Sequence, residues 1–122
     1  MKPGLKGPAR WLKAFQYSWQ GFRAAYKFEA AFREEVWLLL LSTPVAIYFA
    51  SNGVELVLLI GSVLMLMVVE LLNSAIESVV DRVGDEYHEL SGRAKDMGSS
   101  AVLVMITIML ITWVAIILPK IL

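Results

Sequence analysis

The feature that most constrains this chain is a run of 22 residues, 97–118, without one charged side chain. At about 1.5 Å per residue, a helix of that length reaches roughly 33 Å, enough to cross the ~30 Å hydrocarbon core of a bilayer. Two other apolar stretches precede it, 36–50 and 56–80. The first is too short to cross the hydrocarbon core unless flanking helical turns are added to it. The second is long enough to cross it but contains Glu70, Asn73 and Glu77. We therefore predict three transmembrane helices, at 34–51, 54–82 and 97–118.

The composition agrees with a membrane protein built as one domain, 1–122. Hydrophobic residues make up 58% of the 122 residues, above the roughly 45–50% apolar content of soluble domains. Eleven Lys and Arg balance eleven Asp and Glu, so net charge gives no reason to expect nucleic-acid binding. The absence of cysteine excludes disulfides, thiolate nucleophiles and Cys-ligated metals. The expected fold class is an all-α membrane protein.

The basic residues predict the orientation of the chain in the membrane. Seven precede the first span, three lie at the end of the second span or between it and the third, and only Lys120 follows the third. Because cytoplasmic segments carry the excess of Lys and Arg, the N-terminus and residues 81–96 are expected to face the cytoplasm. The first apolar run begins only at residue 36, so we expect no cleaved signal peptide.

Residues 9–28 form a different kind of pattern. Trp11, Phe15, Trp19, Phe22 and Tyr26 fall on one side of a helical wheel, and basic and amide side chains fall opposite. A basic, aromatic helix of this type lies in the membrane interface and is attracted by anionic lipid. We predict a surface helix over 9–28, which either only anchors the chain or also borders a site.

Glu70, Asn73, Glu77 and Asp81 are spaced three or four residues apart and share one helix face. Ionisable side chains inside a bilayer are costly, so they face a bundle interior or a polar cavity. A polar seam that joins helices is one explanation. The other is a site for Mg²⁺, which takes one or two protein carboxylates and completes its shell with water and phosphates. Glu29 is expected at a similar depth, whereas Glu34 and Glu35 are interpreted as a solvated helix start.

The charged segment 81–96 contains Arg93 and Lys95, which are suited to phosphate oxygens, and the single histidine, His88. An ordinary surface loop is the simpler interpretation, with His88 at the surface rather than on a metal. The chain has neither a Walker G-x-x-x-x-G-K-[ST] motif nor a G-x-G-x-x-G motif.

Residues 70–99, ELLNSAIESVVDRVGDEYHELSGRAKDMGS, closely resemble the signature of the bacterial integral-membrane diacylglycerol kinases. The stretches YSWQGFRAA at 17–25 and EAAFREE at 29–35 match the same family. The resemblance covers roughly residues 10–113. It implies homotrimers of three-span subunits with shared active sites, in the inner membrane of Gram-negative bacteria, that transfer the γ-phosphoryl group of MgATP to diacylglycerol and so produce phosphatidic acid.

By matching positions, the resemblance implies Glu70 as general base, supported by Asn73, with Glu29 and Glu77 holding Mg²⁺. The implied nucleotide contacts are Arg10, Tyr17, Glu29, Glu77, Glu86, Tyr87, His88, Lys95 and Asp96. The implied lipid contacts are Arg10, Ala14, Phe15, Gln16, Tyr17, Ser18, Trp19, Arg23, Ala24, Ala25, Tyr26, Ala31, Phe32, Arg33, Glu34, Glu35, Glu70, Ser99 and Trp113. Two alternatives stay open: an undecaprenol kinase, which resembles the same family, and a proton-coupled transporter without enzymatic activity.

Overall fold

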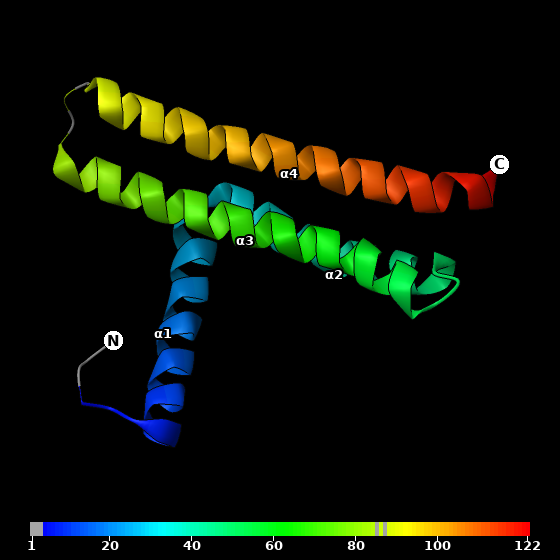
Figure 1. Cartoon of the computed structure of the whole chain (residues 1–122), viewed down its shortest axis with the longest axis horizontal. Coiled ribbons are helices and arrows are strands. Elements are labelled where there is room, and N and C mark those ends of the chain that lie inside the picture. The colour runs from blue at the N-terminus through cyan, green and yellow to red at the C-terminus, as the bar shows by residue number, and fades with distance from the viewer. Residues whose placement is uncertain (1–3, 85, 87) are drawn as a thin grey trace.

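The computed structural model describes residues 4–84, 86 and 88–122, and the regular structure in these ranges is entirely helical. Its helices are α1 (Gly7–Phe28), α2 (Ala30–Phe49), α3 (Gly53–Val83) and α4 (Glu89–Ile121). Helices α3 and α4 run side by side, α2 packs against α3, and α1 projects away from the other three (Figure 1). The all-α expectation is confirmed.

Helices α3 and α4 are long and apolar enough to cross a membrane. Only 28% of the most apolar segment of α3 and 6% of that of α4 is buried within the chain. A core helix of a soluble protein would be largely covered, so the exposure of these two helices indicates a membrane protein.

Helix α2 differs because it begins with charged residues. Every stretch of 18 residues within Ala30–Phe49 includes Arg33, Glu34 and Glu35. The apolar part that remains is shorter than the hydrocarbon core. The third membrane span therefore stays a prediction.

The corner between α1 and α2 is formed by Glu29, the one residue between them, whose backbone is extended (φ −114°, ψ 108°). Arg33 spans this corner: its Nη1 donates to the carbonyl oxygens of Tyr26 (2.9 Å) and Lys27 (3.0 Å) in the last turn of α1. Phe22 of α1 stacks on Phe32 of α2, with 6.4 Å between ring centroids. These contacts set the direction in which α1 leaves the bundle.

The α3–α4 pair is the main packing unit, and Leu59, Val63 and Leu66 of α3 and Met105 of α4 are buried. At one end, Lys120 forms an ion pair with Glu55 (2.8 Å) and a hydrogen bond with Ser51. Asn52 begins α3 by accepting from the Glu55 backbone N–H at 2.9 Å. The start of α3 and the end of α4 are thus joined by polar contacts, far along both helices from the acidic residues.

Candidate active site around the acidic residues of α3

The polar stripe of α3 turns toward the interior of the chain. Glu70, Asn73 and Ser74 are buried, Glu77 is half-buried, and Asp81 is exposed where the helix nears its end. The Asn73 Nδ2 donates to Glu77 Oε1 at 3.3 Å, and the Ser74 hydroxyl donates to Glu70 Oε1 at 3.5 Å. The two acids are therefore each held by a neutral donor one helical turn away.

Four glutamates from three parts of the chain gather here. Glu29 from the α1–α2 corner and Glu77 from α3 act electrostatically on Glu70, and Glu70 acts on Glu35 of α2. The three ion pairs found within the described ranges involve other carboxylates, those of Glu55, Asp81 and Glu89. None of these four carboxylates thus forms an ion pair with a described Lys or Arg, and Lys95 acts on Glu77 only at longer range.

The interpretation of Glu34 and Glu35 as a solvated helix start is wrong for Glu35. Glu34 is exposed, but Glu35 is only 8% exposed and its Oε1 is buried without a hydrogen-bond partner among the described residues. Helix α2 begins at Ala30, so Glu35 belongs to its second turn and follows buried Phe32 by three residues on the same face. This spacing was the signal in the sequence, and it depends on knowing where the helix begins.

The donor set suits a hard divalent cation. Carboxylate and amide oxygens are the ligands that Mg²⁺ and similar ions prefer. No three His, Asp or Glu side chains converge tightly enough to enclose an ion in residues 4–84, 86 and 88–122. An ion bound mainly by water and phosphate oxygens needs only one or two protein carboxylates, which Glu29 and Glu77 could supply from neighbouring elements.

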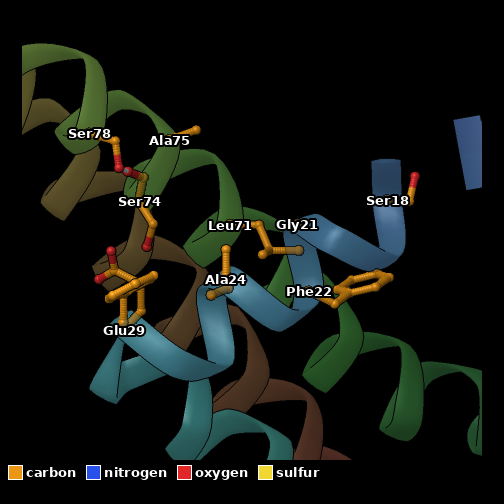
Figure 2. Close-up of a pocket in the computed structure, with 11 residues that line it drawn as sticks. Ser18, Gly21, Phe22, Ala24, Glu29, Leu71, Ser74, Ala75 and Ser78 are labelled. Carbon is orange, nitrogen blue, oxygen red and sulfur yellow. Dashed lines mark hydrogen bonds between the residues drawn. The ribbon is translucent and has the colours of Figure 1, made fainter. Parts of the chain in front are cut away.

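A cleft of about 540 Å³ lies between α1 and α3 beside this cluster. Its α1 wall is lined by Ser18, Gly21, Phe22, Ala24, Ala25 and Phe28, and its α3 wall by Leu71, Ser74, Ala75 and Ser78. Figure 2 shows Glu29 at the end of this cleft where Ser74 and Ser78 emerge from α3. The cleft therefore has a mostly apolar length and one polar end.

A second cleft, of about 660 Å³, lies between α1 and α2. It is lined by Trp19, Phe22, Arg23, Ala24, Tyr26, Lys27, Phe32, Val36 and Met67. The two clefts are lined by seven of the residues expected to contact lipid: Ser18, Trp19, Arg23, Ala24, Ala25, Tyr26 and Phe32. Ala31 is exposed on the first turn of α2, and Arg33 is engaged with the end of α1.

The N-terminal half of α1 is not brought to the acids. The residues concerned are Arg10, Ala14, Phe15, Gln16 and Tyr17, none of which belongs to either cleft lining. They lie on the part of α1 that projects from the bundle (Figure 1). Arg10 is nineteen residues from Glu29, roughly 28 Å along a helix, so the predicted contacts of this half lie far from Glu70 within one chain.

The segment after α3 forms a small polar cleft of about 380 Å³ that includes Asp81, Glu86, His88 and Lys95. Lys95 pairs with Asp81 at 2.6 Å, and His88 Nδ1 caps α4 by accepting from the Leu90 N–H at 3.1 Å. His88 is exposed, as expected of a surface histidine, and Asp96 is exposed on α4. Tyr87, a predicted nucleotide contact, lies outside the described residues.

The two predicted lipid contacts on α4 lie at different levels. Ser99 is exposed beside Gly98, which packs against Asn73. Trp113 instead donates its indole N–H to the Leu59 carbonyl oxygen (3.1 Å) and Ser62 Oγ (3.2 Å). Leu59 and Ser62 precede Glu70 by eleven and eight residues, about 12–16 Å along α3, so Trp113 does not join the acidic cluster within one chain.

Comparison with known proteins shows the family to which this chain belongs. The sequence model of the family described as prokaryotic diacylglycerol kinase matches residues 16–117. Over 113 residues, 93% of each chain, the sequence is 55% identical to a protein from Escherichia coli (strain K12) named diacylglycerol kinase. A protein of the same name from Pseudomonas aeruginosa is 48% identical over 115 residues, 94% of each chain. Another from Haemophilus influenzae is 47% identical over 102 residues, which are 84% of this chain and 86% of the relative. The chain therefore belongs to the prokaryotic diacylglycerol kinase family.

Proposed function

We propose that this protein phosphorylates diacylglycerol with ATP, giving phosphatidic acid and ADP, at the cytoplasmic face of the bacterial inner membrane. The observation that carries the proposal is the cluster of Glu29, Glu35, Glu70 and Glu77, which forms no ion pair with a described Lys or Arg and which adjoins an apolar cleft. The names of the relatives support the activity. The ten-to-one distribution of basic residues supports the orientation, with three spans and a cytoplasmic N-terminus.

In the proposed reaction, the lipid hydroxyl oxygen forms a bond to the γ-phosphorus of ATP, and the bond from that phosphorus to the β–γ bridging oxygen breaks. ADP leaves, and the hydroxyl proton passes to Glu70. Glu70 suits this role because it is the deepest acid of the stripe, held by Ser74, at the level where a lipid alcohol would stand. General bases typically contribute about 10²–10⁴ in rate.

Phosphoryl transfer relies mainly on positioning and charge neutralisation. Glu29 and Glu77 would hold Mg²⁺, which neutralises phosphate charge when bound, and Asn73 would keep the Glu77 carboxylate in place through its hydrogen bond. We place ATP against Glu86, Tyr87, His88, Lys95 and Asp96, with Arg10 and Tyr17. Lys95 is paired with the Asp81 carboxylate. Nucleotide binding there would replace that carboxylate with phosphate oxygens as the partner of Lys95.

Diacylglycerol would occupy the clefts beside α1. The apolar cleft between α1 and α3 leads to Glu29 at its polar end, as an acyl chain and a glycerol hydroxyl would require. We propose that homotrimers supply Arg10 and Tyr17 from one subunit to the acids of another, so that the active sites are shared.

The test is transfer of label from γ-³²P-ATP to diacylglycerol in mixed micelles, with and without Mg²⁺. We expect lipid-dependent transfer that requires Mg²⁺, a loss of about 10²–10⁴ in kcat for Glu70→Gln, and a higher Mg²⁺ requirement for Glu77→Gln. Glu89→Gln is the matched control, because it removes an exposed carboxylate paired only with Arg93.

A parallel assay with undecaprenol tests the choice of lipid. Preference for undecaprenol would contradict the proposed substrate while leaving the chemistry intact. Full activity of Glu70→Gln would contradict its role as base, and proton-coupled transport without ATP turnover would contradict the proposed function as a whole.

A further inference from the structure

Gly98 of α4 lies directly against the side chain of Asn73. A methyl group at position 98 would overlap Asn73 Oδ1 and lie 3.1 Å from its Cγ. Gly98 is buried at the main helix–helix interface of the chain. By contrast, a methyl group on Gly61 of α3 would meet nothing within 4 Å. Gly98, unlike Gly61, therefore lies so close to another side chain, that of Asn73, that a Cβ would collide with it.

This contact determines how the Asn73 amide is oriented. Its Oδ1 is buried against α4 without a hydrogen-bond partner among the described residues, while its Nδ2 donates to Glu77 Oε1 at 3.3 Å. In the reversed orientation, the amide oxygen would face the Glu77 carboxylate, and two acceptors would oppose each other. The backbone of α4 at Gly98 lies so close to the amide that a Cβ there would overlap its Oδ1.

We propose that Gly98 is a positioning residue: by letting α4 lie against Asn73, it holds the amide that orients the Glu77 carboxylate. This inference rests on the proposed function, in which Glu77 binds Mg²⁺. Residues that orient a metal ligand typically change metal affinity by about 10–100-fold when they are replaced. A glycine has no side chain to bind the metal, so we expect its effect to pass through Asn73, the side chain that it contacts.

The test measures metal binding directly, by electron paramagnetic resonance of Mn²⁺ bound with a non-hydrolysable ATP analogue to the full chain in detergent micelles. We expect Gly98→Ala to weaken Mn²⁺ binding about tenfold and to raise the Mg²⁺ concentration for half-maximal turnover by a similar factor, with the KM for lipid unchanged. Gly61→Ala is the matched glycine control and should leave Mn²⁺ binding unchanged.

A double-variant comparison shows whether the effect passes through the amide. Asn73→Ala should itself weaken Mn²⁺ binding, and adding Gly98→Ala to it should cause little further loss, because the overlapping atoms are gone. An equal loss from Gly98→Ala with and without Asn73, or no loss in the single variant, would overturn the inference. If Gly98→Ala alone fails to assemble, assembly of the double variant supports the inference, and failure of both overturns it.

The same measurements separate this inference from the proposed function. If Glu77→Gln leaves Mn²⁺ binding unchanged, the proposed metal site is wrong. If Glu77→Gln and Asn73→Ala weaken binding but Gly98→Ala does not, only the role of Gly98 is wrong.

Discussion

Arg33 illustrates how one side chain sets the geometry of a larger element. The last carbonyl groups of a helix have no partners within it, and Arg33 supplies donors to two of them, on Tyr26 and Lys27. Because Arg33 itself lies in the first turn of α2, this contact ties the end of one helix to the start of the next. The direction of α1 therefore depends on a residue outside α1.

We expect Arg33→Met to loosen this corner and lower the free energy of unfolding by about 1–2 kcal/mol, the value of hydrogen bonds from a charged donor that is partly solvated. Amide hydrogen exchange should accelerate in residues 25–29, which comprise the last turn of α1 and the corner residue Glu29. Arg33→Lys should give an intermediate effect, because an ammonium group lacks the planar fork of guanidinium. Unchanged exchange at 25–29 in Arg33→Met would contradict this role.

At the scale of elements, the contacts of α4 must fix its register, that is, its position along α3. Its apolar residues are spread around the whole helix and few of them are buried within the chain, so hydrophobic packing by itself only weakly favours one position along α3. Polar contacts occur at three levels: Lys95 with Asp81, Trp113 with Leu59 and Ser62, and Lys120 with Glu55. These directional contacts select one register, which also places Gly98 against Asn73.

Trp113→Phe tests this account, because it keeps an aromatic ring and removes the indole N–H. We expect a loss of about 1 kcal/mol in the free energy of unfolding, the usual contribution of one hydrogen bond, because a single indole N–H is shared between two acceptors. The loss is measured by denaturant titration in mixed micelles. Trp37→Phe is the control, because Trp37 is exposed on α2. Equal losses in the two variants would show that the Trp113 hydrogen bonds do not hold α4.

At the scale of the whole molecule, two features of the single chain are explained by its surroundings, namely the bilayer and the other subunits of the proposed trimer. Helix α4 leaves most of its apolar surface uncovered. Helix α1 projects from the other helices (Figure 1), and Arg10 and Tyr17 in its N-terminal half line neither cleft beside the acids. A bilayer covers the first feature in part. The proposed trimer accounts for the second, because α1 of one subunit would reach the acidic cluster of its neighbour.

Mixing inactive subunits tests this arrangement. When Arg10→Ala and Glu70→Gln chains are unfolded, mixed and reassembled, we expect activity to recover, because some sites combine an intact α1 from one chain with intact acids from another. Glu29 acts on Glu70 within one chain, so a mixture of Glu29→Gln and Glu70→Gln chains should stay inactive. Recovery in the second mixture, or none in the first, would contradict the proposed assignment of site residues to subunits.

The sequence by itself determined the helical class, the apolar segments and the common face of Glu70, Asn73 and Glu77, because periodicity is a property of one helix and its own axis. The motif at 70–99 also indicated the family. Only the tertiary structure decided that Glu35 is buried, that Trp113 bonds to α3 and that Gly98 confines Asn73. The burial of Glu35 depends on where α2 begins, and the contacts of Trp113 and Gly98 depend on the register of α4 against α3. Contacts between segments far apart in the chain set both, and no local pattern of residues records them.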